Sequence, residues 1–471
     1  MNENDLKKLF DRVEKKYLQC WEILSSLKTK ADSSITIFQG LVCEALIELS
    51  GGYRNIHQVR QDLIKRKSHL SKKYFTNRQR VLDRRQKDII AAIGIGRAMG
   101  DAFVWPFFHN DRELLEEHSK HQYSVQMPPG LGGIGEMMFM RNVRLFGEYM
   151  VVYHGITTIL RIGDITFIDL KRLKVAGIGE IKTSPLNKNE LNISIIMNFT
   201  NKSLPVKLPK TKKSKKTKAA IDKLPNSMKD RLKRQMHKIS DTLSIDEAQK
   251  PKTNLKRYLK FYYREFDDLL SNSKSNTFSY SQFGDGLLCT VYRQNKRSMY
   301  AAISSKSSKD INSRLDEMIP RAEKLLLKGS ELNNIKIGFL MYTDGGIPWL
   351  MPGAKPLFWW PINIEMIRRV IFHECLVVSI YNPAHLLNSL KKRGYVIIQK
   401  KGKRLDFKIE RIIDRKKMVY ENLWFFFELI SQSLIRESEI LEMILSSAKE
   451  VQEIGTSNEN LKADFRLYQM F

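Results

Sequence analysis

Two acidic residues and a lysine are spaced so that a strand hairpin could bring them together. Asp164 comes directly before the apolar run Ile165–Ile168. Glu180 and Lys182 are two residues apart near the end of the next apolar run. Successive strand side chains point to opposite faces, so Glu180 and Lys182 share a face. If the hairpin is centred on Leu173, Asp164 lies opposite Lys182 and diagonal to Glu180, within about 4.5–8 Å.

Such a cluster suits divalent-cation chemistry. Burying two carboxylates without a partner costs several kcal/mol, and a bound cation removes most of that cost. Two carboxylates and the backbone carbonyl of Ile181 form a hard-oxygen ligand set for Mg²⁺, and Mn²⁺ is expected to substitute. The alternative is an exposed salt bridge at the end of a hairpin, with a stabilising effect of ~0–1 kcal/mol.

The acid-x-Lys triplet alone is unspecific in a chain this rich in charge. Glu14-Lys15-Lys16, Asp169-Leu170-Lys171 and Asp406-Phe407-Lys408 match it as well. The first falls in a helical pattern and the second in the expected hairpin turn. The third has an upstream strand that offers lysines and no carboxylate. Glu180 alone combines a strand, a facing aspartate and an acidic residue on a preceding helix.

The pattern resembles the PD-(D/E)XK nuclease superfamily over about residues 131–183. The resemblance rests on Gly163-Asp164 at the start of one strand and Glu180-Ile181-Lys182 on the next. That family usually also has an acidic residue on the helix before the sheet, and Glu136 occupies this place. The resemblance implies a restriction-endonuclease-like α/β core with a central mixed sheet.

The same resemblance implies a role for each residue. Asp164, Glu180 and the Ile181 carbonyl would hold one or two Mg²⁺ ions. Glu136 would orient the metal-bound water or help to hold a second ion. Lys182 would position the attacking water and offset charge on the phosphorus. A metal ion in such a site lowers the pKa of its bound water and stabilises the developing oxyanions.

A further helix is expected over Ser227–Ser244, after the Glu-x-Lys strand. In several branches of the superfamily a helix at this place supplies a glutamine or a basic residue to the substrate phosphate. Gln235 resembles that glutamine, although the tyrosine often found four residues later is Ile239 here.

The charge of the chain points to polyanionic partners. Eighty Lys and Arg against 51 Asp and Glu give a formal net charge of +29. Nucleic acid is the commonest partner of so basic a protein, and DNA is favoured over RNA here. A basic helical stretch over Val59–Arg85 and a lysine-rich segment after the hairpin supply the candidate phosphate contacts. The alternatives are a solvated helix face and a linker that contacts nothing specific. The candidates are Lys72, Lys73, Lys210, Lys212, Lys213, Lys215, Lys216, Arg231 and Arg234.

Composition also indicates where the chain works. The four cysteines are far apart and form no CxxC pair, which fits a reducing cytoplasm. No N-terminal signal and no apolar run of about 18 residues is recognised, so no membrane span is expected. His109, His118 and His121 could in principle bind a metal, but solvated histidines are the favoured interpretation. Trp349, Phe358, Trp359 and Trp360 are expected in the core rather than stacked on bases.

Three domains are expected. Residues 1–127 form a helical N-terminal domain, in which Gly51-Gly52 ends a helix over Ile35–Leu49 and glycines within Ile89–Phe108 indicate close helix packing or a break. Residues 128–345 form the nuclease-like domain, with a flexible lysine-rich insert at 200–220. Residues 346–471 form a C-terminal α/β domain that ends in a long helix over Lys417–Ile454. The fold class is therefore mixed α/β.

These observations predict a Mg²⁺-dependent endonuclease that hydrolyses phosphodiester bonds, with a restriction or anti-phage defence role in a prokaryote. The defence role rests on analogy of fold. The alternative is a non-catalytic nucleic-acid-binding or effector subunit of a larger defence assembly, with a degenerate nuclease fold. Self-association or a partner protein from a defence system is left open, with the terminal helices as the contact.

Overall fold

The chain has a mixed α/β fold with a helical N-terminal region. The computed structural model divides into two compact units, Met1–Asn254 and Leu255–Phe471. The described residues are 2–28, 35–108, 112–119, 121, 126–142, 149–169, 171, 174–185, 191–199, 259–296, 298–306, 309–326, 336–339, 355–399, 406–413, 416–421 and 423–453. The lysine-rich insert at 200–220 and the helix expected over Ser227–Ser244 lie outside them.

The division differs from the three expected domains. Residues 1–127 and the sheet that follows them belong to one unit. The expected boundary at residues 345 and 346 would cut a sheet, because β7 (Lys336–Phe339) is hydrogen-bonded to β8 (Cys375–Tyr381). Loop composition suggested these boundaries, but the strand pairings and helix contacts that cross them decide which segments fold together.

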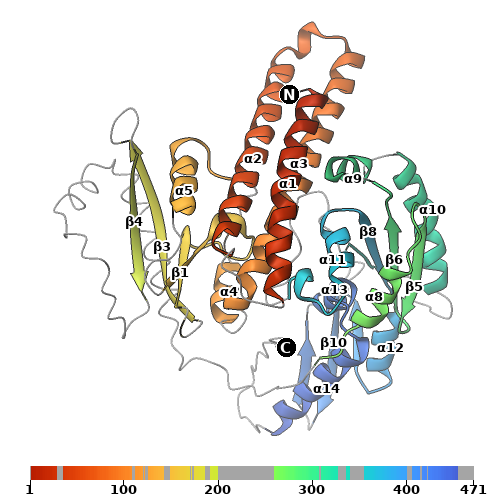
Figure 1. Cartoon of the computed structure of the whole chain (residues 1–471). Coiled ribbons are helices and arrows are strands. Elements are labelled where there is room, and N and C mark those ends of the chain that lie inside the picture. The colour runs from red at the N-terminus through yellow and green to blue at the C-terminus, as the bar shows by residue number, and fades with distance from the viewer. Residues whose placement is uncertain are drawn as a thin grey trace. The chain divides into compact units, whose positions relative to one another are not determined.

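Three long helices form the N-terminal region and lie side by side (Figure 1). They are α1 (Glu3–Leu27), α2 (Ile35–Lys65) and α3 (Lys72–Phe108). On α1 the apolar residues recur every three or four positions, and that face is buried. A capping box between Asn2 and Asp5 begins the helix. Lys16 ties α1 to α2 through Glu44 at 2.9 Å and Glu48 at 2.7 Å.

Two glycine-based expectations have different outcomes. The prediction that Gly51-Gly52 ends a helix is wrong, because α2 continues to Lys65. Two glycines cost roughly 2 kcal/mol of helix propensity, which the packing of α2 against α1 and α3 offsets. Close helix packing is confirmed at Gly96 and Gly100 of α3. An added Cβ would lie 2.5 Å from the Tyr17 hydroxyl at Gly96 and 1.8 Å from the Ile156 carbonyl oxygen at Gly100.

Among the described residues, α3 is the one helix long and apolar enough to cross a membrane, by length and composition alone. This differs from the expectation that no such run exists. Of the apolar window, 83% is buried inside the structure. A helix in a protein core needs the same composition, so its packing accounts for the apolar stretch.

The first unit also contains a four-stranded antiparallel sheet in the order β1-β2-β3-β4. The strands are β1 (Tyr149–Tyr153), β2 (Ile165–Asp169), β3 (Lys174–Pro185) and β4 (Leu191–Phe199), and the 3-10 turn η2 (His154–Ile156) follows β1. Helix α5 (Gly130–Asn142) lies against β3 (Figure 1). Gly130, Gly132 and Gly133 lie within the first turn of this helix. The first unit also contains η1 (Lys67–His69) and α4 (Arg112–Ser119).

A glutamine from α2 closes the β1 edge of this sheet. The side-chain amide of Gln39 donates to the Val151 carbonyl at 2.7 Å, and its oxygen accepts from the Tyr153 N–H at 2.8 Å. An edge strand otherwise presents unpaired backbone groups, which are costly to bury. One buried side chain therefore replaces a neighbouring strand and fixes α2 to the sheet.

The second unit contains a four-stranded sheet in the order β5-β6-β8-β7 and a three-stranded sheet in the order β11-β10-β9. Every pairing between named strands is antiparallel, so the expected mixed sheet is not observed among the described residues. The other elements are α8 (Tyr263–Ser271), β5 (Phe278–Phe283), β6 (Leu287–Arg293), α9 (Met299–Lys306), α10 (Lys309–Leu326), η4 (Leu357–Trp359), α11 (Ile364–Ile371), α12 (Ala384–Lys391), β9 (Val396–Gln399), β10 (Phe407–Ile413), β11 (Lys416–Tyr420), α13 (Trp424–Ser433) and α14 (Glu437–Glu453).

The terminal helix is shorter than expected. Part of the range Lys417–Ile454 forms the strand β11, which pairs with β10, and the rest divides into α13 and α14. Leu434 ends α13 in the left-handed conformation, with φ of 57°. In the same unit Phe358 and Trp360 are 1% and 6% exposed, which confirms the core interpretation for these two aromatics.

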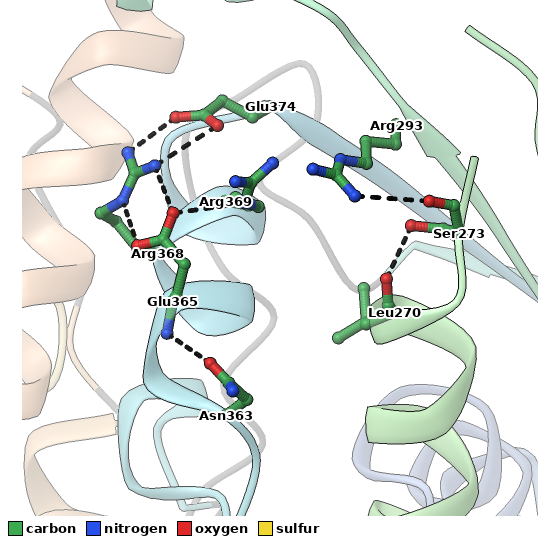
Figure 2. Close-up of polar contacts among 8 residues, drawn as sticks. All are labelled: Leu270, Ser273, Arg293, Asn363, Glu365, Arg368, Arg369 and Glu374. Carbon is green, nitrogen blue, oxygen red and sulfur yellow. Dashed lines mark hydrogen bonds and ion pairs between the residues drawn. The ribbon is translucent and has the colours of Figure 1, made fainter. Parts of the chain in front are cut away.

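Ion pairs join α11 to the start of β8 (Figure 2). Arg368 contacts Glu365 at 2.8 Å and Glu374 at 2.7 Å, and Arg369 contacts Glu365 at 3.2 Å. Hydrogen bonding from Arg368 is the largest cause of the lowered pKa of Glu365. Each carboxylate in this cluster has a guanidinium partner, so the cluster is electrostatically balanced and structural in character.

The two kinds of helical glycine predict opposite effects of substitution by alanine. Gly51→Ala adds a methyl group that meets nothing within 4 Å, and it should stabilise the protein by about 1 kcal/mol through helix propensity. Gly100→Ala should destabilise it by several kcal/mol, because its Cβ would overlap the Ile156 carbonyl. Urea unfolding followed by circular dichroism measures both. Equal effects would contradict the packing described for α3.

Candidate metal centre

The centre begins with the register of the β2–β3 hairpin. Ile165 pairs with Gly179, and the Asp164 N–H donates to the Gly179 carbonyl at 2.8 Å. Extending the register by one residue brings Asp164 level with Glu180, so the prediction that it faces Lys182 is wrong by two residues. Asp169 pairs with Lys174 at the end of the hairpin, which centres the hairpin about 1.5 residues before Leu173, and the register shift between Phe167 and Ile168 offsets one of the three resulting residues. Alternation of residue types cannot reveal such a shift.

Gly163 forms a tight turn before β2 that orients Asp164. Gly163 has a φ of +73°, and an added Cβ would lie 2.7 Å from Ile178 and 2.8 Å from the Gly179 carbonyl oxygen. Only glycine fits this left-handed conformation beside another strand without strain. The turn directs the Asp164 carboxylate to β3, where Oδ2 accepts a hydrogen bond from the Ile181 N–H at 2.7 Å.

Glu180 has a buried oxygen without a partner. Its Oε1 pairs with Lys182 Nζ at 2.7 Å, and the side chains of Glu180 and Lys182 are 4% and 39% exposed. Its Oε2 is buried and has no hydrogen-bond partner in the described part of the chain. An unsatisfied buried carboxylate oxygen is costly, and a cation is the partner that satisfies it best.

The Ile181 carbonyl is directed to the same side of β3 as Asp164. In an antiparallel strand the N–H and the C=O of one residue point to the same neighbour. The Ile181 N–H donates to the Asp164 carboxylate, so the Ile181 carbonyl points toward it as well. Asp164 precedes the first residue of β2, and the carbonyl therefore lies where the strand pairing stops.

Glu136 reaches the same region from α5. It is 8% exposed and accepts a hydrogen bond from the Tyr153 hydroxyl. Gly135 permits the close approach of α5 to β3, since an added Cβ would lie 2.0 Å from the Thr183 hydroxyl. Burial raises the pKa of Glu136, and the charge of Glu180 raises it further, while Tyr153 and Lys182 act in the opposite direction.

The carboxylates act on one another electrostatically. Burial raises the pKa of Asp164 to about 8, and the charges of Glu180 and Glu136 add to this effect. The Ile181 N–H and Lys182 lower the pKa of Asp164 in part. Burial and the nearby charge of Glu136 raise the pKa of the Tyr153 hydroxyl well above its usual range, so it remains a hydrogen-bond donor. Three acids and one ammonium therefore share a buried region with excess negative charge.

The donors fit a hard divalent cation in type, but they are not arranged as a finished coordination shell. Among the residues that the structure describes, no group of three or more His, Cys, Asp or Glu forms a metal-binding cluster. Glu180 Oε1 is bound to Lys182, and Glu136 is bound to Tyr153. Oxygen donors from Asp164, Glu180 and Glu136 and the unpaired Glu180 Oε2 match what Mg²⁺ prefers. Binding through the two oxygens that already have partners would require Glu180 to turn from Lys182 and Glu136 to turn from Tyr153.

A buried network that the sequence analysis missed holds the Gly-Asp turn in place. His154 donates through Nδ1 to the Gly163 carbonyl at 3.1 Å, and its Nε2 accepts from the Thr166 hydroxyl at 2.6 Å. A carbonyl only accepts, which assigns the ring proton to Nδ1. Burial lowers the pKa of His154 to about 3, so the ring is neutral. The backbone N–H of His154 also donates to the Asp164 carbonyl at 2.8 Å.

Asp101 on α3 fixes the segment that follows η2. Its carboxylate accepts from the Thr158 N–H at 2.6 Å and from the Thr158 hydroxyl at 2.7 Å, and it also accepts from the Thr157 hydroxyl. Asp101 is 1% exposed. A single acid inside the apolar stretch Ile89–Phe108 was the signal that could have revealed it, because buried acids require partners. No feature of the sequence around Tyr153 indicated that its hydroxyl would bind Glu136.

The other predicted residues are placed elsewhere. Lys72 and Lys73 lie in the first turn of α3, about 40 Å along the helix from Asp101 at 1.5 Å per residue. Five lysines, two arginines and the predicted glutamine lie outside the described residues. They are Lys210, Lys212, Lys213, Lys215, Lys216, Arg231, Arg234 and Gln235.

The histidines of α4 and its neighbourhood do not behave as expected either. His118 is fully buried rather than solvated. Its Nδ1 accepts from the Arg161 N–H at 2.8 Å and from the Ile162 N–H at 3.0 Å, which leaves this nitrogen unavailable to a metal. His109 lies outside the described residues. His118 therefore stabilises the loop that leads into Asp164.

Comparison of the chain with models of protein families, with curated proteins and with solved structures gives no match.

The raised pKa of Asp164 predicts how stability depends on pH. Between about pH 4 and pH 8 the folded protein retains a proton on Asp164 that the unfolded chain releases. In EDTA the free energy of unfolding should therefore fall as the pH rises across this window, by at most about 1.4 kcal/mol per pH unit. Urea unfolding of the wild type and of Asp164→Asn at pH 5, 6.5 and 8 measures this, and the variant should show the flatter dependence.

The control for loss of a carboxylate is Asp62→Asn on α2, whose side chain accepts from Gln58 rather than lying beside other acids. It should retain the wild-type dependence on pH. Parallel curves for Asp164→Asn and the wild type would show that Asp164 retains no proton in the folded state.

Proposed function

We propose that this chain is a Mg²⁺-dependent nuclease that hydrolyses phosphodiester bonds, with a core around β1 to β4 that has a restriction-endonuclease-like set of acids on an antiparallel rather than a mixed sheet. One observation carries the proposal. Glu136, Asp164, Glu180 and Lys182 come from three different elements and interact electrostatically in one buried region. The region has excess negative charge and an unpaired carboxylate oxygen on Glu180. A bound cation would neutralise the excess charge and coordinate the unpaired oxygen.

Each residue has a defined part in the reaction. Asp164, Glu180 and the Ile181 carbonyl would hold Mg²⁺, and Glu136 would orient the water or help to hold a second ion. When bound, Mg²⁺ would supply a lowered pKa for the attacking water and stabilisation of charge on the phosphate oxygens. The Lys182 side chain is 39% exposed, so it could contact the substrate phosphate and position the water. Tyr153 keeps the Glu136 carboxylate in place.

The class of substrate follows from charge. A net charge of +29 favours a polyanion, and DNA is proposed over RNA by analogy with restriction enzymes. A restriction or anti-phage role in the cytoplasm of a prokaryote is proposed by analogy with proteins that have such a core. Mn²⁺ should replace Mg²⁺, because both take oxygen ligands. If Gln235 lies on a helix beside the sheet, it would contact the substrate phosphate.

One observation favours a second function. The described carboxylates do not form a finished metal cluster, and Lys182 is bound to Glu180. A non-catalytic nucleic-acid-binding or effector subunit of a defence assembly, with a degenerate nuclease fold, would show the same features. It would bind DNA with a steep dependence on salt and release no product in Mg²⁺ or Mn²⁺.

The test uses purified full-length chain with circular DNA, linear DNA and RNA, each with Mg²⁺ or EDTA. The wild type should release products in Mg²⁺ only. Glu180→Ala and Lys182→Ala should each lower the rate of cleavage at least about a hundredfold, because each removes a charged group at the reacting phosphate. Both variants should still bind DNA, as measured by fluorescence anisotropy in EDTA.

The second unit supplies a matched control. Lys408 Nζ and Glu410 Oε1 are 3.0 Å apart, and the two residues have the same two-residue spacing on a strand. Glu410→Ala and Lys408→Ala should leave the rate of cleavage unchanged. Mg²⁺-dependent cleavage by both Glu180→Ala and Lys182→Ala would reject the assignment, and the absence of any wild-type product would favour the non-catalytic alternative.

A further inference from the structure

The end of the α2–α3 hairpin has a large local excess of positive charge. Between Val59 and Asp88 the sequence has eleven Lys and Arg against three Asp. Five of these basic residues are exposed around the connection between the helices and are here called the hairpin tip: Lys65, Arg66, Lys67, Lys72 and Lys73. Tyr74 beside them is 56% exposed.

The hairpin tip projects beyond α1. The ion pairs of Lys16 with Glu44 and of Arg12 with Glu48 set the antiparallel alignment of α1 and α2. Extending this alignment places the start of α1 level with about residue 58 of α2, and α2 and α3 continue past it (Figure 1). Nothing in α1 therefore covers the tip or offers it carboxylates.

Acidic side chains do not balance the charge of the tip. Asp83 is paired with Arg60 at 3.0 Å, and the Asp62 side chain accepts from Gln58. The Lys65, Lys72 and Lys73 side chains have no carboxylate partner among the residues that the structure describes. Exposed ammonium groups without partners are the groups that exchange counterions for phosphates on binding nucleic acid.

Both helices connect the tip to the metal centre without a break. On α2, Gln39 binds β1 beside Tyr153, and Lys65 follows 26 residues later in the same helix, about 39 Å away at 1.5 Å per residue. On α3, Asp101 fixes the segment after η2, and Lys72 precedes it by 29 residues, about 44 Å. The separation is therefore fixed by two packed helices rather than by a linker.

We propose that the hairpin tip is a second contact for double-stranded DNA, about 40 Å from the cleaved phosphate. A base pair rises 3.4 Å, so the tip reaches the duplex about 12 base pairs from the metal centre. A duplex is stiff over about 150 base pairs and can bridge two points at a fixed separation. The hairpin therefore sets a minimum duplex length for tight binding. The position of the cleaved phosphate rests on the proposed function, while the contact itself does not.

The test compares two triple variants of the full-length chain with equal loss of charge. The tip variant is Lys65→Gln/Lys72→Gln/Lys73→Gln. The control variant is Lys7→Gln/Lys8→Gln/Lys15→Gln, three exposed lysines on α1. Affinity for labelled DNA duplexes of 10 and 30 base pairs is measured by fluorescence anisotropy in EDTA at several salt concentrations. Circular dichroism checks that both variants are folded.

The tip variant should bind the 30-base-pair duplex at least about tenfold more weakly than the control variant. The slope of log affinity against log salt should fall by about 2.7 for three lost contacts. The 10-base-pair duplex is too short to reach both points, so the gain in affinity from 10 to 30 base pairs should be small in the tip variant and intact in the control.

Equal affinities of the two variants for the long duplex would overturn the proposal, as would a loss seen with duplex RNA but not with DNA. The same measurements distinguish a failure of this proposal from a failure of the proposed nuclease activity. A chain whose tip variant loses binding but which never cleaves DNA retains the second contact. A chain that cleaves DNA and binds equally well in both variants retains the nuclease only.

Discussion

The burial of three neighbouring carboxylates is the constraint on which the candidate metal centre depends. Asp164 and Glu180 meet on adjacent strands, and Glu136 joins them from α5. Burial and mutual repulsion raise the pKa of Asp164 to about 8. The fold supplies three compensating donors, which are the Tyr153 hydroxyl, the Ile181 N–H and the Lys182 ammonium. These leave Glu180 Oε2 unpaired. A site of this kind is stabilised by a cation, and the same cation would activate water.

The N-terminal helices hold this region in place as well as covering it. Gln39 pairs with the free edge of β1, and Asp101 holds the threonines that follow η2. His154 then links that segment to Gly163 and Asp164. The helices that position the acids are also the helices that end in the basic tip. Within this unit, the packing of α2 and α3 against the sheet therefore sets both the position of the acids and the distance from them to the hairpin tip.

The second unit also contains acidic and basic side chains in contact, but in these contacts each acid is neutralised by a basic partner. Lys408 and Glu410 form an ion pair on β10, and Arg368 pairs with Glu365 and Glu374. Each acid in these clusters has a basic partner, so ion pairing and local geometry account for them. An acid-x-Lys triplet becomes a candidate for catalysis only where further acids are buried against it, as at Glu180.

The sequence by itself determined the mixed α/β class, the strand that follows Asp164, the strand that holds Glu180 and Lys182, and the helix that holds Glu136. Local periodicity, the Gly163 turn and residue chemistry are all properties of short segments. Only the tertiary structure decided that Asp164 lies level with Glu180, that α2 continues through Gly51-Gly52, and that β7 and β8 share a sheet. It also decided the partners of Asp101, His154 and Tyr153. These features depend on contacts between residues far apart in the chain, and packing at such contacts outweighs local preference.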